Sequence, residues 1–352
     1  MDLFADLPPP DSENGSSTQD GGGLFGDLPE PKREKRKQEN DDETSDKKRR
    51  LENDVKFLLK GFVTERMGER EDMQDAHVVM DDFGPEFSDD HIPHDVSRLA
   101  YYAIFDGHAG AEAAKFAAKN LHKNIVRKFP KGEVVNKDKE IKRCLIDAYR
   151  KTDEEFLQEA TKHNPTLKDG STAVSILVVN DVLYVANLGD SKALLCRRNE
   201  DGKYSIVSLT KDHSPTQYEE RLRIQKSGGN VREGRVLGIL EVSRSFGDGR
   251  FKGCGVIATP DVLRCSLTDK DKFLLLACDG LWKGFEVDEA IKYINDILEG
   301  ETAIKSNKGT DESEDENEPT LYEIACSSVA GDAIRKGSSD NVTVMLVEIQ
   351  SA

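Results

Sequence analysis

The sequence lacks the features that mark several protein classes. Its 352 residues include only six cysteines, and no two of them form a Cys-x-x-Cys pair. That spacing does not support a zinc site or a thiol nucleophile and is typical of reduced, buried thiols. No apolar run is long enough to span a bilayer, and the N-terminus has neither the basic start nor the apolar core of a secretory signal. We therefore expect a soluble intracellular protein.

The sequence also has fewer basic than acidic residues. The chain has 50 basic and 67 acidic residues, which gives a formal net charge of −17. This excess of acid disfavours binding of the whole protein to nucleic acid or to an anionic membrane, so we expect neither as a partner. The chain is 36% hydrophobic and 33% charged, which is polar for a globular protein and predicts a non-globular portion.

Residues 1–53 are predicted to form that portion, a disordered tail rich in Pro, Gly, Ser and charge. The sequence Leu-Phe-x-Asp-Leu-Pro occurs at residues 3–8 and again at 24–29. This repeat is either a docking motif or a duplicated linker. Basic clusters at residues 32–37 and 47–50 resemble a bipartite nuclear-import signal, with a solvated charge run as the alternative. Import would place the protein in both nucleus and cytoplasm.

Residues 54–352 are predicted to form one folded domain of the α+β class. Apolar residues at helical spacing predict amphipathic helices in pairs: 114–129, 141–160, 287–300 and 321–336. Between residues 171 and 208, strands alternate with turns. Paired helices and strand hairpins favour antiparallel sheets over a doubly wound parallel sheet. A short helix is predicted at 215–227 with Pro215 in its first turn, and a surface loop at 305–319.

Four aspartates stand beside stretches that read as buried strands. Asp106 and Asp279 each close an apolar run, Asp190 lies in a turn between two such runs, and Asp340 precedes the last one. A buried carboxylate is costly unless something neutralises it. Strand ends that converge could share a divalent cation, and Mg²⁺ and Mn²⁺ prefer oxygen ligands. The sequence therefore predicts a metal site built from strand ends.

Other polar residues add chemistry to this prediction. Gly107 lets the backbone approach closely, so its carbonyl could ligate a metal, and His108 could give a proton to a leaving group. Arg70, just ahead of a strand, could present its planar fork to a phosphate. Each motif has a plainer alternative, a tight turn or a solvated loop. The segments 169–173 and 242–248 are either further site residues or turn chemistry.

Together and in this order, the motifs resemble the metal-dependent type 2C family of protein serine/threonine phosphatases. The resemblance covers about residues 57–349 and rests on seven segments: 70–77, 105–110, 169–173, 189–191, 242–248, 278–282 and 339–342. It implies a four-layer α-β-β-α sandwich in which two antiparallel sheets are each flanked by a helix pair. It is strongest to members associated with integrin-linked kinase, which implies that kinase and phosphoprotein substrates as partners. It also implies a monomer that acts in kinase signalling and cell-cycle control.

The resemblance assigns metal ligands to individual positions. Asp106 would bridge two Mg²⁺ or Mn²⁺ ions, the Gly107 carbonyl would complete one ion's shell, and Asp279 and Asp340 would complete the other's. The implied reaction is direct hydrolysis, in which a water bridging the two ions attacks the phosphate in line with the departing Ser or Thr oxygen. Such a reaction needs no side-chain nucleophile.

Three further residues receive catalytic roles from the resemblance. Asp75 would orient the attacking water, Arg70 would hold the substrate phosphate, and His108 would protonate the leaving alkoxide. Because the phosphate is dianionic, the metals and Arg70 must provide the attraction that the net charge of −17 does not.

Two positions depart from the family's pattern. Gln74 stands where many members have a metal-binding glutamate, and a neutral amide is a weaker ligand. Lys283 stands where many members have an aspartate that, with Asp190 and Asp279, belongs to a third and weaker metal site. A lysine should repel a cation there, so we predict a weak or absent third site. These departures motivate a second hypothesis, a catalytically weak scaffold that binds kinases, although the four core aspartates count against a decayed site.

Overall fold

The structure is a computed structural model that describes residues 55–88, 92–132, 136–307 and 318–352, the last seven residues of the third range by their backbone alone. The predicted tail, with its repeat and its basic clusters, lies outside the described residues. No helix in the described ranges is both long enough and apolar enough to cross a membrane.

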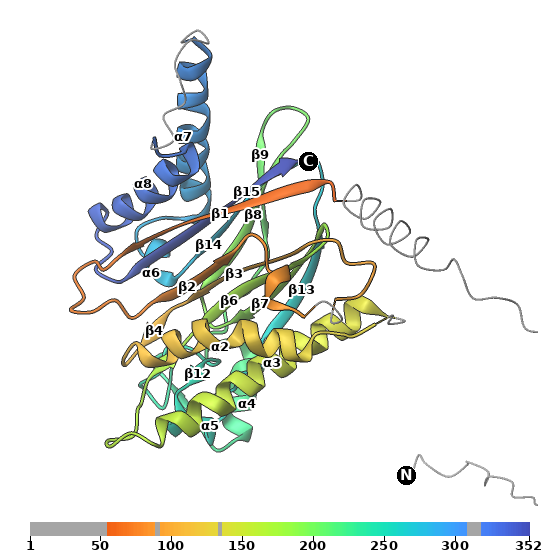
Figure 1. The fold of residues 1–352 in the computed structure, drawn as a ribbon. Coiled ribbons are helices and arrows are strands. Elements are labelled where there is room, and N and C mark those ends of the chain that lie inside the picture. The colour runs from red at the N-terminus through yellow and green to blue at the C-terminus, as the bar shows by residue number, and fades with distance from the viewer. Residues whose placement is uncertain (1–54, 89–91, 133–135, 308–317) are drawn as a thin grey trace, which may run out of the picture. The chain divides into compact units, whose positions relative to one another are not determined.

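Two five-stranded antiparallel sheets organise the described chain (Figure 1). The first sheet contains, in spatial order, β1 (Phe57–Arg66), β15 (Val342–Ser351), β14 (Asp271–Ala277), β8 (Lys192–Arg198) and β9 (Tyr204–Ser208). The second contains β13 (Asp261–Ser266), β7 (Val182–Leu188), β6 (Ala173–Val179), β3 (Leu99–Phe105) and β2 (Ala76–Met80). The antiparallel α+β class predicted from the sequence is therefore confirmed.

Two small sheets complete the strands. The three-stranded one joins β12 (Phe246–Gly247), β5 (Gly170–Ser171) and β4 (Gly107–His108), and the two-stranded one joins β10 (Val231–Arg232) to β11 (Arg235–Val236). In the first of them, residue 170 pairs with residue 108 on one side and with residue 247 on the other. This register brings three distant segments of the chain to one place.

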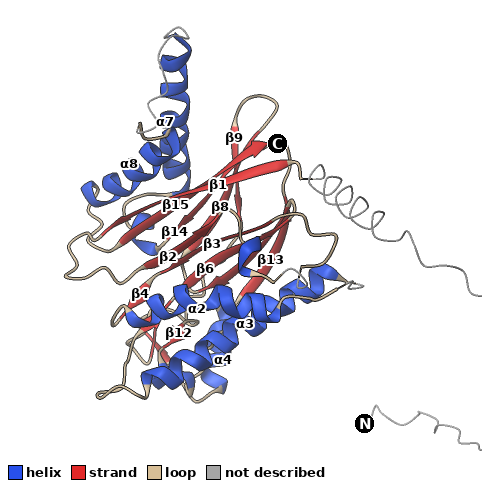
Figure 2. Ribbon diagram, viewed as in Figure 1, coloured by secondary structure: helices blue, strands red, loops and turns tan. Residues whose placement is uncertain are grey.

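The helices lie outside the strands (Figure 2). They are α2 (Glu112–Lys128), α3 (Lys137–Ala160), α4 (Tyr218–Lys226), α5 (Gly249–Lys252), α6 (Asp279–Trp282), α7 (Val287–Asn307) and α8 (Leu321–Arg335), with a 3-10 turn at Gly84–Glu86. Both predicted helix pairs are present as α2 with α3 and α7 with α8. Figure 1 shows the first pair against β3 and β6 and the second pair beside β1 and β15.

Three apolar cores hold these elements together, and β3 contributes to two of them because alternate side chains of a strand point to opposite faces. Tyr101 and Phe105 pack in the core that contains α2 and α3, whereas Tyr102 and Ile104 pack in the core between the two large sheets. The third core joins β14 and β15 to α7 and α8. Burial on both faces explains why the central strands read as continuous apolar runs.

A segment of the chain between residues 218 and 256, hereafter the insert, has a small core of its own. It comprises Ile224, Val236, Leu240, Val242, Phe251 and Val256. At its base the buried Glu220 carboxylate accepts hydrogen bonds from Arg223, Arg244 and Ser243. Arg244 also pairs with Asp261 of β13 at 2.8 Å. These charge-assisted contacts fix the insert against the second sheet.

Two predicted helix boundaries were wrong. Helix α4 begins at Tyr218, because the chain first makes a turn in which the Gln217 N–H donates to the Ser214 carbonyl, so Pro215 lies before the helix. Helix α7 runs to Asn307 and does not end at Gly300. A glycine inside a helix costs only about 1 kcal/mol relative to alanine, which neighbouring helical residues offset. Residues 305–307 of the predicted loop are thus helical, and 308–317 lie outside the described residues.

Candidate metal centre and active site

The four predicted aspartates line one cleft. Asp106 follows β3 and Asp190 follows β7, both in the second sheet, whereas Asp279 follows β14 and Asp340 precedes β15, both in the first. The cleft therefore opens where the ends of the two large sheets come together. Residues more than 200 positions apart in the sequence meet there, as the metal-site prediction required.

Crowding of carboxylates changes their acidity. Burial, together with the charges of Asp75, Asp279, Asp190 and Asp340, raises the pKa of Asp106 well above its ordinary value. Burial and then the charge of Asp279 raise the pKa of Asp190 to about 6. Like charges held close together in a buried site disfavour ionisation. The carboxylates of the cleft therefore need additional positive charge before they can all ionise.

Asp75 lies behind this cluster and is only 6% exposed. The Thr343 hydroxyl donates to its Oδ2 at 2.6 Å. Burial raises the pKa of Asp75 to about 6 in spite of that hydrogen bond. Ligand atoms of Asp75, Asp106 and Cys278 all lie within 4.8 Å of one another. Burial raises the pKa of the Cys278 thiol well above its ordinary value, so the sulfur is present there as a neutral thiol.

Two positively charged side chains, Lys283 and Arg70, lie at the rim of the cluster. Lys283 Nζ lies 2.6 Å from Asp279 Oδ2 and 2.5 Å from Asp340 Oδ2, and it does not contact Asp190. Arg70 holds the same Asp340 with both arms of its fork, each at 2.9 Å. Burial opposes ionisation of Asp340, but Lys283 and Arg70 hold its pKa below the ordinary value. Lys283 thus takes the place of a cation between two predicted metal ligands.

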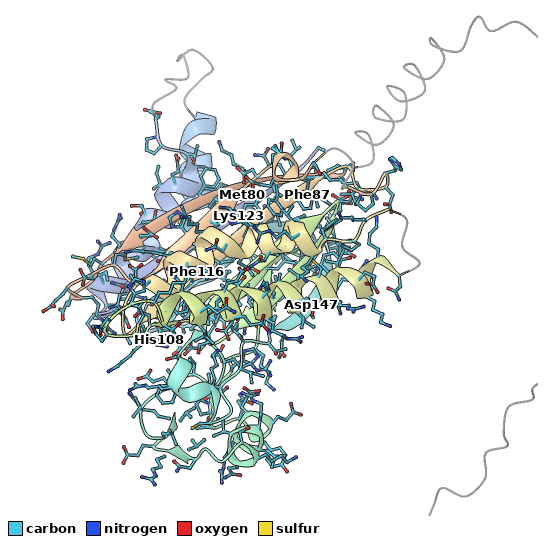
Figure 3. The ribbon with its side chains drawn as sticks, turned by 60° about the horizontal axis from the view of Figure 1, so that its bottom comes forward. Met80, Phe87, His108, Phe116, Lys123 and Asp147 are labelled. Carbon is cyan, nitrogen blue, oxygen red and sulfur yellow. The ribbon has the colours of Figure 1, made fainter. Side chains whose placement is uncertain are left out.

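His108 forms the pair that sequence reasoning missed. Its Nε2 lies 2.7 Å from Oδ2 of Asp248, which also accepts from the Ser245 hydroxyl at 2.7 Å. Burial lowers the pKa of His108, but the hydrogen bond and charge of Asp248, with the charges of Asp190 and Asp169, raise it above its ordinary value. Figure 3 labels His108 at the end of the molecule where α2 begins.

The backbone at residue 170 makes this pair possible. A Cβ at Gly170 would lie 2.2 Å from His108 Nε2 and 2.3 Å from Asp248 Oδ2. Only glycine leaves room for the contact between the imidazole and the carboxylate. The segments 169–173 and 242–248, which the sequence left as site residues or turns, therefore contribute to the site. The signal available in the sequence was an aspartate at the end of the segment 242–248, directly after Phe246 and Gly247.

Asn341 holds the loop that carries the remaining predicted residues. Its side chain accepts from the Gln74 N–H at 2.8 Å and donates to the carbonyls of Met67 at 2.8 Å and Asp72 at 3.1 Å. These bonds fix both ends of the segment that contains Arg70. Sequence reasoning assigned no role to Asn341, because three separate backbone contacts of one side chain leave no local pattern.

The donor set suits hard divalent ions. Asp106, Asp279 and Asp340 offer carboxylate oxygens beside the backbone of Gly107. The raised pKa of Asp106 means that its carboxylate needs a positive partner in order to ionise fully there. The one sulfur in the cluster is a neutral thiol, whereas a soft metal would need a thiolate. The residues present thus fit Mg²⁺ or Mn²⁺.

Comparison with known proteins decides the family. Residues 59–342 match the family model described as protein phosphatase 2C. The chain belongs to this family. Members of it are serine/threonine protein phosphatases, and the 2C resemblance drawn from seven short segments of the sequence is confirmed.

Two relatives within the 2C family match over almost their whole length. Integrin-linked kinase-associated serine/threonine phosphatase 2C from Bos taurus is 48% identical, and the alignment covers 99% of this chain and 100% of that protein. The Homo sapiens protein of the same name is 49% identical with the same coverage.

Among solved structures, a serine-threonine phosphatase 2C from Toxoplasma gondii superposes with a TM-score of 0.66 at 20% identity, covering 83% of this chain and 95% of that one. This likeness supports the 2C fold.

Proposed function

We propose that this 2C phosphatase hydrolyses phosphoserine and phosphothreonine in proteins, by in-line attack of water at a centre of two Mg²⁺ or Mn²⁺ ions. One observation carries the proposal. Carboxylates from the ends of both large sheets converge in a cleft that also contains the Arg70 fork and the His108–Asp248 pair. An acidic cluster needs a cation, and an adjacent arginine and imidazole suit a phosphoester substrate.

The residues that would hold the ions are Asp106, the Gly107 carbonyl, Asp279 and Asp340. When bound, the ions would supply a water acidic enough to attack near neutral pH and would screen the charge of the phosphate. The buried carboxylate of Asp75, held by Thr343 and with a pKa of about 6, is suited to accept a hydrogen bond from that water and orient it.

The substrate would contact Arg70 and His108. Arg70 is 55% exposed at the mouth of the cleft, where the guanidinium N–H groups that are not bound to Asp340 can donate to phosphate oxygens. When His108 is charged, its Nε2–H donates to Asp248, and Nδ1–H, which has no partner among the described residues, remains for the leaving oxygen. The raised pKa of His108 favours the charged form, as protonation of a Ser or Thr alkoxide requires.

Hydrolysis of a phosphopeptide tests the proposal. We expect release of phosphate with added Mn²⁺ or Mg²⁺ and none in excess chelator, because the acidic centre alone repels a dianionic phosphate. Phosphate release can be followed for phosphoserine and phosphothreonine peptides of matched sequence. Equal turnover in chelator would contradict the metal-dependent reaction, and no turnover with either ion would favour the alternative of a catalytically weak scaffold.

Lys283 allows a separate prediction about the number of ions. We expect the protein to bind two ions and Lys283→Asp to bind a third, weaker one, because the substitution replaces the ammonium between Asp279 and Asp340 by an anion. Isothermal titration with Mn²⁺ gives the stoichiometry without reference to activity. Lys211→Asp, at an exposed lysine that has no ion pair in the described chain, is the control. Identical metal binding by Lys283→Asp and the parent would contradict the prediction.

The finer architecture, the partner and the location belong to the same proposal. We infer a four-layer α-β-β-α sandwich from the three cores, which lie between helix pair and sheet, between sheet and sheet, and between sheet and helix pair. The names of the relatives support integrin-linked kinase as a partner. That the protein is a monomer and acts in kinase signalling and cell-cycle control stays a prediction from the resemblance. The basic clusters at 32–37 and 47–50 support nuclear as well as cytoplasmic location. Co-precipitation with the kinase and imaging of a variant with neutral clusters test these two points.

A further inference from the structure

Four basic side chains of Lys or Arg line the cleft, and three of them are paired with carboxylates. Arg70 and Lys283 are held by the aspartates of the centre, and Arg235 pairs with Glu241 of the insert. The fourth, Arg250, has no carboxylate or hydrogen-bond partner in the described part of the chain. In a cleft crowded with acid, an arginine that pairs with none of it is available to bind an anion from outside.

The position of Arg250 is fixed by its neighbours. Phe251 is 1% exposed in the core of the insert, and Lys252 donates to the Ser245 carbonyl at 2.8 Å and pairs with Asp153 at 3.0 Å. These contacts fix α5 to the insert core and to α3. The Arg250 guanidinium lies over the Phe251 ring, 4.4 Å from its centre. Stacking restricts the side chain and leaves the donors at the edge of the guanidinium plane free.

The place of Arg250 in the chain relates it to the reaction. It follows Asp248, the partner of His108, by two residues, and it lines the same cleft as the carboxylates of the centre. We propose that Arg250 binds an anionic group that flanks the phosphorylated residue of the substrate, so that acidic phosphopeptides are preferred. This inference rests on the proposed phosphatase function and adds a substrate class to it. The anion is either a carboxylate side chain or a second phosphate.

The insert also contributes an apolar side chain to the lining of the cleft. Ile239 lines the cleft and is 52% exposed, one of five large apolar side chains that stand exposed in the described chain. A tight turn presents it: Gly238 has a φ of +73°, and the Ile239 N–H donates to the Val236 carbonyl at 3.0 Å. The buried Leu240 anchors the turn. The insert thus offers the substrate an apolar side chain as well as a cation, which suits a peptide that combines acidic and apolar residues near the phosphate.

Kinetics of Arg250→Ala on a set of phosphopeptides test the inference. One peptide has neutral residues on both sides of the phosphoserine. Others carry a glutamate within about three residues of it, since an extended chain advances ~3.3 Å per residue. Another carries a second phosphoserine at that distance. We expect kcat/KM for acidic peptides to fall roughly 3- to 10-fold, as for a partly exposed ion pair, and to fall less at high salt. Turnover of the neutral peptide and of p-nitrophenyl phosphate should not change. The glutamate and phosphoserine arms show which anion is preferred.

Two further variants sharpen the test. Arg250→Glu should reverse the preference, so that peptides with a lysine in place of the glutamate become the better substrates. Arg232→Ala removes an exposed arginine of β10 that does not line the cleft, and it should leave all substrates unaffected. Equal losses on every substrate for Arg250→Ala, or no loss on acidic peptides, would overturn the inference. Metal-dependent turnover of p-nitrophenyl phosphate by the parent checks the proposed function separately.

Discussion

Asp106→Asn is expected to abolish turnover and, at the same time, to stabilise the metal-free protein. The substitution keeps the shape of the side chain but removes the charge that would bridge the two ions. Metal-ion stabilisation of a phosphoryl transition state is worth several kcal/mol, and ~1.4 kcal/mol corresponds to a factor of ten, so kcat should fall at least about 10³-fold. Phosphopeptide hydrolysis in saturating Mn²⁺ measures this loss.

The gain in stability follows from the electrostatics of the cleft. In chelator, desolvation and then the charges of neighbouring aspartates raise the pKa of Asp106, so its ionisation at neutral pH opposes folding. A neutral amide removes that cost, so we expect the free energy of unfolding in chelator to rise. Urea unfolding in chelator and in Mn²⁺ measures the stability of the parent and of Asp106→Asn without and with metal. In Mn²⁺ the parent should be the more stable of the two, the reverse of the order in chelator.

A matched control separates this effect from a general loss of negative charge. Asp201→Asn removes a carboxylate from the exposed turn after β8, and it should change neither turnover nor stability appreciably. If Asp106→Asn destabilised the protein equally with and without metal, the carboxylate would be a structural hydrogen-bonding group, and the metal-centre interpretation would fail.

Asp248→Asn should lower kcat for phosphoserine peptides about 10²–10⁴-fold, the usual contribution of a general acid. The substitution leaves a polar partner for His108 but removes the negative charge that helps to raise the pKa of its imidazole. His108 then retains the burial that lowers its pKa and loses the main cause that raises it. A general acid is active below its pKa, so the alkaline limb of the pH–kcat profile should move to lower pH.

The choice of substrate distinguishes this effect from misfolding. p-Nitrophenyl phosphate has a leaving group that departs without protonation, so its turnover should depend much less on His108 and Asp248 than that of a phosphoserine peptide. A variant that lost activity equally on both substrates, with an unshifted pH profile, would show that Asp248 only supports the structure. The charges of Asp190 and Asp169 also face His108, so some of the shift in its pKa should persist.

The sequence indicated which residues stand directly at strand ends. It did not indicate which side chains on other elements those residues contact. Asp106 and Asp279 were recognisable because each closes a long apolar run that can only be a buried strand. Asp248 follows a two-residue strand, too short to produce a periodic pattern, and its partner is 140 residues away. The insert was missed as a unit for the same reason, since its strands have two residues each and its core is small.

The ion-pair partners of Lys283 and Arg70 also could not be predicted from the sequence. Lys283 was expected to repel a cation, but nothing local indicated that it would join Asp279 to Asp340, because the second partner lies 57 residues further along the chain. Arg70 was expected to serve a phosphate, and in the structure it is already engaged by Asp340. The identity of each residue was readable, whereas its partner depended on how the two large sheets bring their ends together.

The state of Cys278 has a consequence for life under oxidative stress. Peroxides attack thiolates, and phosphatases with a cysteine nucleophile must keep one in the open. Here the Cys278 thiol beside Asp75 and Asp106 is fully buried, donates to the Asn341 carbonyl and accepts from the Thr343 N–H. A buried thiol held in its uncharged form reacts slowly with peroxide, so we expect this enzyme to retain activity at peroxide concentrations that inactivate phosphatases with a cysteine nucleophile.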